Sequence, residues 1–493
     1  MRWELGGGRA PDPVGLLVRG GPGGTAVGVE SLERAAVDLA RVAREGAQLG
    51  WRAGAAAVDV DVVAGALLSR ATGVAAMAGL SDVGVGLTAE LAALLELAGA
   101  VRAAGAAYRA GEAAVARAVE DLQDRVMAVG GLLAPELLVG CLALHSLGVD
   151  VPGLVDRVAF DHPQVADLAG GAEGLVLGLH ADPLTAPLLR PAPPHLHDDD
   201  LDAFDDAFDD LDYEDAVAVL ADSAARWGLL DDRGRAQVTP ELAPRPGALA
   251  LRSLRDLVAD QGNVGDGEDY AGHVRVIEVA QPSGSVWIVE VSGTQEWDPR
   301  AGDNPFDLTT DLRSMAQQST VLADGVQQAL AQAQAAARVG HRESAGVAAP
   351  VLLVGHSLGG IAAAGLASSP RFTARHRVTH VVTVGAPVAR MPVPPGIEVL
   401  SLEHTRDAVP RLDGRPNPDR ASWVTVTRDA YEDGDDRAST VHDLGGYVQT
   451  AALVDDSSDP SVAAWRSSSA AFFAGDTHGV AVIRDYAIRR VRP

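Results

Sequence analysis

Apolar residues in the first 190 positions recur at intervals of three or four residues, which is the spacing of one face of a helix. The pattern is clear in residues 30–51, and a second, longer one covers residues 88–126. The apolar positions are Leu32, Ala35, Leu39, Val42, Gly46 and Leu49, and then Leu91, Leu94, Leu97, Val101, Tyr108, Val115, Val119, Leu122 and Val126. The sequence therefore predicts an all-α domain over residues 1–190, most simply an antiparallel bundle of long alanine-rich helices.

A proline-rich and acidic junction follows at residues 191–215. The letters PAPPHLH end any helix, and eleven acidic residues then lie between Asp198 and Asp215 without a basic one. Four apolar residues of this stretch share one helical face. They are Leu201, Phe204, Phe208 and Leu211. We interpret the junction as a solvated linker that leads into a helix over Tyr213–Trp227. The alternative is an amphipathic acidic helix that docks on a partner or on a groove of the chain itself.

From about His273 the pattern changes to short apolar runs that alternate with helical stretches. The runs VRVIEVA and VWIVEV flank a turn at Pro282-Ser283-Gly284 and predict two paired strands. Further strands are expected at Val351–Val354, His380–Val384, Glu398–Leu402 and Trp423–Thr427, and helices at Asp311–Ala337 and Leu358–Ala367. Strands that alternate with helices are typical of a mostly parallel sheet covered on both faces. The predicted fold class is therefore α/β over residues 216–493, preceded by the all-α domain.

Composition narrows the chemistry. The net charge is −27, and all 40 basic residues are arginine, which excludes a lysine nucleophile, a Schiff base and a P-loop lysine. Because so acidic a surface repels phosphate and no arginine stripe is present, we expect no nucleic-acid partner. Cys141 is the single cysteine, which excludes disulfides within the chain and thiolate metal clusters.

Signals for membranes and export are sparse. No stretch reaches 18 uninterrupted apolar residues, and charged residues break the longest candidate, Ala55–Leu80. A membrane-spanning helix is therefore not expected. The first residues, MRWELGGGRAPDPVG, lack the positive charge and apolar run of a secretory signal peptide.

One serine stands in the context of a nucleophile elbow. The run Val351–Val354 leads into Gly355-His356-Ser357-Leu358-Gly359, and an alanine-rich helix follows. An elbow needs a buried strand before the serine, a helix after it, and glycines where a Cβ would clash in the sharp turn. Ser357 meets these conditions. The similar letters LHSLG at Leu144–Gly148 lack the first glycine and the strand, so Ser146 is interpreted as structural.

A serine nucleophile needs a base within hydrogen-bond reach and a carboxylate that orients the base. In folds with such an elbow the acid and then the histidine follow the serine along the chain. Asp407, just after the strand VLSLEH, and His442, in a loop before a helix, satisfy this order. The alternatives for the base are His478 and His404, and those for the acid are Asp413, Asp443 and Asp429. His356 is interpreted as a packing residue.

The oxyanion of the reaction needs two backbone N–H donors. One is expected from Leu358, directly after the nucleophile, and the other from the turn Gly293-Thr294-Gln295 after the strand VWIVEV. The alternative for that turn is a purely structural role. The segment Trp297–Leu308 is either a lid that presents Trp297 and Phe306 to an acyl chain or a plain surface loop. No metal or cofactor is required.

These pieces together resemble the class 3 lipases, a branch of the α/β-hydrolases. The matching letters are SGTQ and then DL at Asp311, VLLVGHSLGGIAAAGLA, VTHVVTVGAP, HTRDAVPRL and HDLGGYV, in the family's order. The resemblance implies an α/β-hydrolase domain with Ser357, Asp407 and His442 as triad, and Thr294 and Leu358 as oxyanion donors. Ser292 replaces the family's usual arginine, and VARMPVPPG differs from the usual continuation after Gly385-Ala386-Pro387, which affects the expected substrate more than the reaction.

The helical half more faintly resembles the WxG-type hairpins that actinobacterial type VII systems export. Trp51-Arg52-Ala53-Gly54 stands at the place of the WxG, with one extra residue, and Tyr108 to Glu112 match a Y-x-x-x-[DE] export signal. A surface contact on a helix is the alternative for the tyrosine. The resemblance implies a helical partner protein and an exported destination, and a cytoplasmic one stays open.

The sequence thus predicts a serine hydrolase of carboxylic esters, with a small-molecule or lipid ester as substrate. Two alternatives stay open. The first is a non-catalytic exported effector or binding protein that keeps the hydrolase fold. The second is an acyltransferase or thioesterase that uses the same triad.

Overall fold

A computed structural model gives the conformation of most of the chain. It describes residues 15–146, 149–189, 211–240, 245–246, 251–264, 272–281, 284–340, 348–430, 437–473 and 481–492. The acidic stretch that the sequence predicts as a linker lies outside the described residues up to position 210, together with most of its expected apolar face. His478 also lies outside them.

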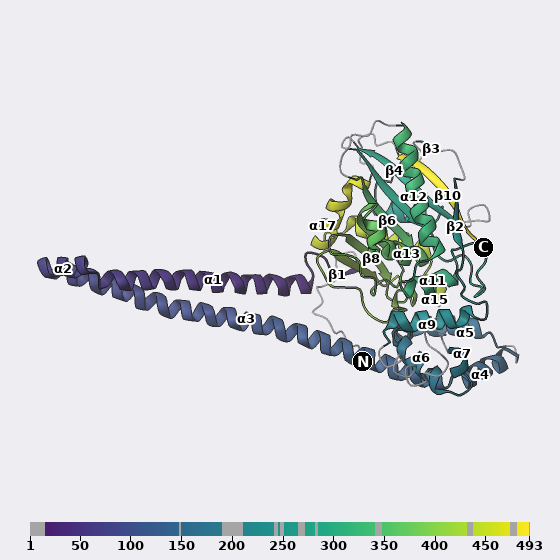
Figure 1. The fold of residues 1–493 in the computed structure, drawn as a ribbon, viewed down its shortest axis with the longest axis horizontal. Coiled ribbons are helices and arrows are strands. Elements are labelled where there is room, and N and C mark those ends of the chain that lie inside the picture. Colours follow the sequence, from purple (N-terminus) through teal and green to yellow (C-terminus); the bar gives the residue numbers. More distant parts are fainter. Residues whose placement is uncertain are drawn as a thin grey trace, which may run out of the picture. The chain divides into compact units, whose positions relative to one another are not determined.

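One mixed sheet forms the centre of the C-terminal region (Figure 1). In the described residues it has ten strands in the order β1-β9-β8-β7-β6-β5-β4-β10-β2, with β3 beside β10. The strands are β1 (Leu16–Gly20), β2 (Arg235–Pro240), β3 (Arg245–Pro246), β4 (His273–Gln281), β5 (Gly284–Val291), β6 (Pro350–His356), β7 (Arg377–Val384), β8 (Glu398–His404), β9 (Trp423–Arg428) and β10 (Ala481–Val491). Strands β5 to β9 are parallel and the other pairs antiparallel. The predicted α/β fold with a mostly parallel sheet and a preceding helical region is confirmed.

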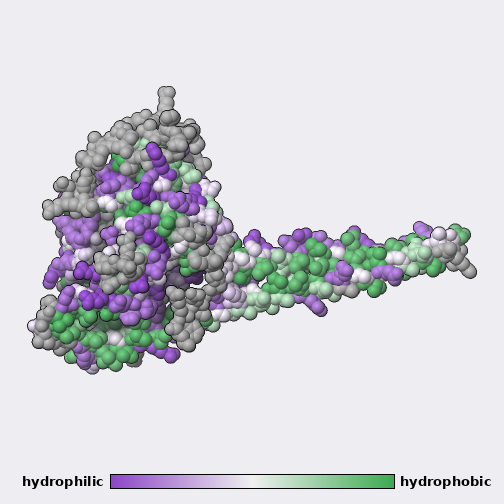
Figure 2. All heavy atoms as spheres, turned by 180° about the vertical axis from the view of Figure 1, so that it is seen from behind, coloured by the Kyte–Doolittle hydropathy of each residue, from purple (hydrophilic) through white to green (hydrophobic). Residues whose placement is uncertain are grey.

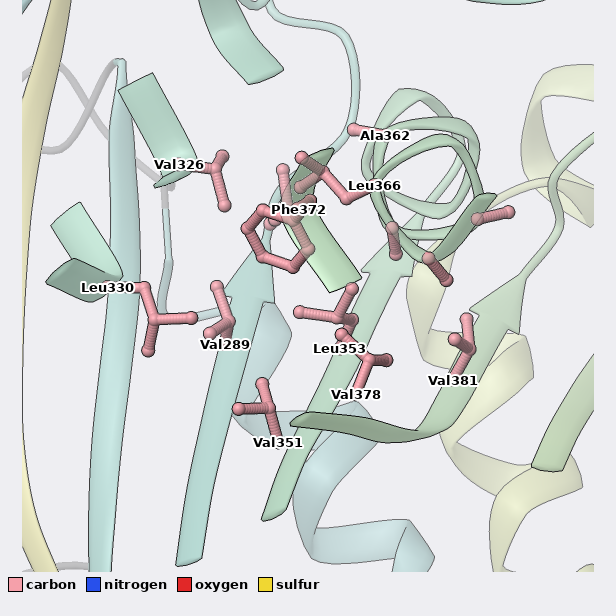
Figure 3. Close-up of a cluster of buried hydrophobic side chains, with 14 of the residues drawn as sticks. Val289, Val326, Leu330, Val351, Leu353, Ala362, Leu366, Phe372, Val378 and Val381 are labelled. Carbon is pink, nitrogen blue, oxygen red and sulfur yellow. The ribbon is translucent and has the colours of Figure 1, made fainter. Parts of the chain in front are cut away.

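The parallel strands are buried on both faces, which explains why their sequences are continuous apolar runs. In β6 the side chains Val351 to Val354 are all inaccessible to solvent. On one face of the sheet Val351 and Leu353 pack in one apolar cluster (Figure 3). Their partners include Leu330 of α12 (Val321–Gly340) and Leu366 of α13 (Leu358–Ser368). On the other face Leu352 and Val354 belong to a second cluster. It is formed with helices α10 (Leu254–Gln261), α16 (Leu444–Asp456) and α17 (Pro460–Ser469). The two layers fix the carboxyl ends of the strands, where the candidate residues lie.

The helices of this region alternate with the strands along the chain. They are α10 (Leu254–Gln261), α11 (Leu308–Met315), α12 (Val321–Gly340), α13 (Leu358–Ser368), α14 (Pro370–Thr373), α15 (Ala438–Val441), α16 (Leu444–Asp456) and α17 (Pro460–Ser469), with short 3-10 turns η2 (Val409–Arg411) and η3 (Ala470–Phe472). Side chains begin several of them. Asp307 accepts a hydrogen bond from the N–H of Thr310, and Asp443 accepts one from that of Gly445.

The chain divides into two compact units at places that the sequence does not mark. One unit is Thr25–Ala118, and the other combines the first 24 residues with Val119–Pro493. The expected boundary at residue 190 does not coincide with this division, for two reasons. Strand β1 pairs with β9 at the edge of the sheet, and residues 119–189 pack against the C-terminal region. Five extended residues ahead of a long helical pattern give no periodic signal that would reveal such a strand.

A group of helices from the first half packs within the larger unit. They are α4 (Ala134–Ser146), α5 (Val151–Asp161), the 3-10 helix η1 (Pro163–Gly171), α6 (Ala172–Ala181) and α7 (Ala186–Leu189), followed by α9 (Tyr213–Ala225). Arg411 forms an ion pair with Asp167 at 2.6 Å, and the Gln123 amide donates to the carbonyl oxygen of Gly414 at 2.8 Å. Apolar side chains gather on the outer surface of this group (Figure 2).

The unit Thr25–Ala118 is a helical hairpin. Helices α1 (Thr25–Ala57) and α3 (Arg70–Leu132) lie side by side, and the short α2 (Val60–Leu68) joins them (Figure 1). Small side chains form their contact, namely Ala36, Ala40 and Ala98. Within the described residues, the part of α3 from Thr72 to Leu132 is long and apolar enough to cross a membrane. Its most apolar window of 18 residues has a mean hydropathy of 1.5. The sequence-based expectation of no such helix considered only uninterrupted apolar runs, and this window tolerates isolated charges.

Strand β1 offers a test of how the larger unit is assembled. Leu16 has no exposed surface and belongs to the apolar cluster beside α16 and α17, whereas Leu17, on the opposite face, is 50% exposed. We expect Leu16→Ala to lower the free energy of unfolding by about 2–5 kcal/mol, as other buried leucines do. The matched Leu17→Ala variant should stay within about 0.5 kcal/mol of the wild type. Urea unfolding followed by tryptophan fluorescence measures both, and equal effects would contradict the role of β1 in the sheet.

Candidate active site

Ser357 lies at a strained turn between β6 and α13. Its backbone has φ 53° and ψ −121°, a left-handed conformation that a side chain other than hydrogen disfavours. No residue with a Cβ fits at the two flanking glycines. A Cβ on Gly355 would lie 2.0 Å from the carbonyl carbon of Gly359, and a Cβ on Gly359 would lie 1.9 Å from the backbone oxygen of Val291. This is the geometry of a nucleophile elbow, as the sequence predicts.

Asp407 and His442 form a close acid–base pair. The Asp407 Oδ2 atom lies 2.7 Å from His442 Nδ1, although 35 residues separate them in the chain. Asp407 follows strand β8 and is fully buried, whereas the His442 side chain, at the end of α15, keeps 19% of its surface exposed. A buried carboxylate at Nδ1 leaves Nε2 as the nitrogen available to a serine.

The carboxylate of Asp407 is held by two further donors. The Tyr447 hydroxyl donates to Oδ2 at 2.7 Å, and the N–H of Val409 donates to Oδ1 at 2.9 Å. Burial acts to raise the pKa of Asp407, but the charge and the hydrogen bond of His442, followed by Tyr447 and Val409, outweigh it, so the pKa is lower than usual. The acid is therefore ionised at neutral pH and can stabilise a charged imidazole.

His356 connects the elbow with the base. Its ring centroid lies 4.7 Å from that of His442, and its Nε2 lies 2.9 Å from the backbone oxygen of His442. Burial, and then the proximity of His442, lower the pKa of His356 to about 3. The ring is consequently neutral, with the proton on Nε2 donated to that carbonyl. The sequence predicts His356 only as a packing residue. Its hydrogen bond to His442 joins residues that are far apart in the chain, so the sequence does not reveal it.

The turn after β5 reaches the elbow. A Cβ built on Gly293 would lie 3.3 Å from the Cβ of Ser357, so Gly293 lies directly beside Ser357. Thr294 donates its hydroxyl to Asp311 Oδ2 at 2.9 Å. Leu358, the other expected donor, is the first residue of α13, where backbone N–H groups have no partner within the helix. The turn and the start of α13 therefore border Ser357 from two sides.

Asp311 is a residue of this site to which the sequence analysis gave no role. It belongs to helix α11, and burial raises its pKa to about 7 despite the opposing hydrogen bond from Thr294. The letters DL at this position were part of the family pattern. What could not be read from them is the direction of the side chain, which depends on how α11 packs against the sheet.

Most of the competing residues have other partners. His404 stacks on Tyr447 with ring centroids 3.7 Å apart, and its two ring nitrogens contact the Val441 oxygen and the Thr450 hydroxyl. Asp413 accepts from the N–H of Ala389 at 2.7 Å. Asp443 begins helix α16, and Asp429 lies at the surface 3.9 Å from Arg406.

The segment Trp297–Leu308 has a core residue in it. Phe306 is fully buried in the cluster over the sheet, so it is not available to an acyl chain. Trp297 is 67% exposed. The backbone N–H groups of Gln295 and Glu296 donate to the oxygen of Phe306, which folds the segment back toward its start. Of the two residues that a lid would present, Phe306 is therefore excluded, and Trp297 is accessible to solvent.

Helix α5 adjoins the loops that carry the acid and the base. Asp156 accepts hydrogen bonds from the N–H of Ser439 at 3.0 Å and from its hydroxyl at 3.2 Å, three residues before His442. Phe160, at the end of α5, lies under the guanidinium of Arg406, which precedes Asp407. The described part of the chain holds no group of three or more His, Cys, Asp or Glu side chains that could bind a metal ion.

Residues 307–462 match the protein family described as the PGAP1-like alpha/beta domain. The match includes Ser357, Asp407 and His442 but begins after Thr294, and it covers less than half of the chain. The family is hydrolase-like, which supports the α/β-hydrolase assignment of the C-terminal region. No curated protein and no solved structure matches the chain. The resemblance of the first half to WxG-type exported hairpins, and with it an actinobacterial origin, gains no support.

A half-buried carboxyl beside the site, that of Glu403, predicts a pH-dependent stability. Glu403 accepts a hydrogen bond from the Asn417 amide, and burial together with the charge of Asp413 raises its pKa to about 8. Between about pH 4.5 and pH 8 only the unfolded chain ionises this group, so the free energy of unfolding falls as pH rises, by up to about 1.4 kcal/mol per pH unit.

Glu403→Gln stays neutral and should therefore lose less stability than the wild type between pH 5 and pH 7.5. Urea titrations at the two pH values measure the difference, which we expect to be up to about 3 kcal/mol. The exposed Asp429→Asn variant serves as control and should follow the wild type. Identical pH dependence in all three proteins would contradict a neutral Glu403.

Proposed function

We propose that this chain is a serine hydrolase that cleaves carboxylic esters, with lipid or other acyl esters as the substrate class. The observation that carries the proposal is the pair Asp407–His442, at 2.7 Å, beside a serine held at φ 53°. The match to a hydrolase-like family over the same residues agrees with it. A catalytic triad consists of a serine at an elbow, a histidine beside it, and an ionised carboxylate that is hydrogen-bonded to the histidine.

In the proposed mechanism His442 removes the proton of Ser357 as the hydroxyl oxygen attacks the ester carbonyl. Asp407 fixes the imidazole tautomer and stabilises its positive charge. Thr294 and Leu358 stabilise the oxyanion, and collapse of the tetrahedral intermediate expels the alcohol, which takes its proton from His442. Water then attacks the acyl-enzyme with His442 as base, and the acid product leaves.

An apolar substrate is supported by the surface next to the base. Helix α5, whose Asp156 holds the segment before His442, exposes Leu154, Val155 and Val158 by 48%, 61% and 42%. Apolar side chains in water beside a candidate active site favour a substrate with its own apolar part. This favours acyl or lipid esters over small polar ones.

Active-site labelling tests the nucleophile. A fluorophosphonate probe should modify the wild type and not Ser357→Ala, because phosphonylation needs a serine activated by its base. His442→Ala should lower both labelling and hydrolysis of p-nitrophenyl esters, from acetate to palmitate, by at least about 10³-fold.

Three results would contradict the assignment. They are equal labelling of wild type and Ser357→Ala, absence of labelling in both, and a loss of activity in His478→Ala that matches that of His442→Ala. The first two would indicate a non-catalytic hydrolase-like fold. Partitioning of the acyl group to an added alcohol or amine would indicate an acyltransferase.

The contact between Thr294 and Asp311 gives a second test. Without its acceptor the Thr294 side chain is free to rotate, and the turn beside the nucleophile loses an anchor. Asp311→Ala should reduce kcat/KM for the preferred ester about 10- to 100-fold, mainly in kcat, which is less than the loss of a whole oxyanion donor. Asp311→Asn keeps an accepting oxygen and should retain most of the activity. Asp324→Ala, on the exposed side of α12, is the control. Equal rates for Asp311→Ala and its control would refute the role of this contact.

A further inference from the structure

The hairpin Thr25–Ala118 leaves much of its apolar surface uncovered. Leu68 is 90% exposed, Trp51 and Val60 are each 76% exposed, and Val85 is 70% exposed. The contact between α1 and α3 is made mainly by alanine, which leaves the larger apolar side chains on the outside of the pair. Figure 2 shows apolar side chains along the outer surface of this unit. A patch of this extent indicates a binding surface.

Charged residues are unevenly distributed along the hairpin. Residues 25–52 contain eight and residues 90–118 contain six, of both signs. The 37 residues between them, 53–89, contain four, which are Asp59, Asp61, Arg70 and Asp82. We refer to residues 53–89 as the distal segment and to the two charged stretches as the shaft. The shaft is suited to water, and the distal segment to an apolar environment.

In the distal segment the apolar side chains of α3 point in opposite directions. Val83 follows Val74 by two and a half helical turns, and Val85 follows it by about three. Val74 and Val85 therefore lie on one side of α3 and Val83 on the other, and these three side chains are 60%, 70% and 52% exposed. A helix that packs against a protein partner needs one apolar face, whereas one that is apolar all round suits lipid.

The length of the distal segment also fits a bilayer. Residues 71–89 of α3 extend over about 28 Å at 1.5 Å per residue, close to the roughly 30 Å of a bilayer's hydrocarbon core. Within residues 71–89 Asp82 is the one charged residue. At the base of the segment Trp51 and Arg52 line a shallow pocket with Ala47 and Gln48. Tryptophan and arginine are residues that prefer the boundary between lipid and water.

From these observations we infer that the distal segment inserts into a phospholipid bilayer and attaches the protein to a membrane surface, with Trp51 and Arg52 at the boundary. The net charge of −27 opposes binding to anionic lipids. The expected surface is therefore zwitterionic, such as phosphatidylcholine. This inference does not rest on the proposed ester hydrolysis.

Vesicle flotation tests the inference on the full chain. In a Ser357→Ala background, which excludes effects of hydrolysis, the protein should float with phosphatidylcholine vesicles. The double variant Leu68→Asp/Val85→Asp should bind at least tenfold less. The matched double variant Leu32→Asp/Leu97→Asp, at shaft positions that are 58% and 51% exposed, should bind like its parent. Circular dichroism checks that the helical content of both variants is unchanged.

Absence of flotation, or equal flotation of the distal and shaft variants, would overturn the inference. So would a dimer seen by sedimentation without lipid that the distal substitutions dissociate, because the surface would then bind a second copy of the chain. The boundary has its own measurement. The difference in emission between wild type and Trp51→Phe should shift to shorter wavelength when vesicles are added, and an unchanged difference would overturn the placement of Trp51.

Discussion

The site depends on keeping one negative charge inside the protein. Asp407 is fully buried, and an isolated carboxylate there would be protonated. Three donors keep it ionised, from His442, Tyr447 and Val409, and they come from different elements. The position of α15 and α16 relative to the end of β8 is therefore not a detail of packing. It is the condition under which Asp407, the acid of the proposed triad, carries a charge.

The elements around that charge also stabilise one another. Tyr447 stacks on His404, whose ring nitrogens contact Val441 and Thr450 on either side of it. His356, the residue before Ser357, donates to the backbone oxygen of His442. A displacement of the base would break the bond to the acid and the bond to the elbow together. His356 and His404, whose pKa values are lowered by burial, thus act as a scaffold around His442.

The sequence carried the central part of this arrangement, and long-range packing decided the rest. Parallel strands such as β6 can be predicted from a continuous apolar run. An elbow can be predicted from glycines at the positions where a Cβ would clash in the sharp turn. Strand β1 and the edge strand β2 could not be read in this way, because each is short and gains its partner from the far end of the chain. The contact of Asp311 with Thr294 and the burial of Phe306 depend on how α11 and its preceding loop meet the sheet. No local pattern encodes that meeting.

The pairing of β1 with β9 has a consequence for how the chain reaches its native state. Leu16 lies opposite Arg428 in the register, so the two partners are 412 positions apart. Contacts of such high sequence separation form late in folding, because the intervening chain must first be ordered. During synthesis the first strand emerges long before its neighbour exists, and its unpaired edge is exposed while the hairpin and the helices that follow are made. Pairing of β1 with β9 would thus report that the chain has been made and folded at least as far as Arg428.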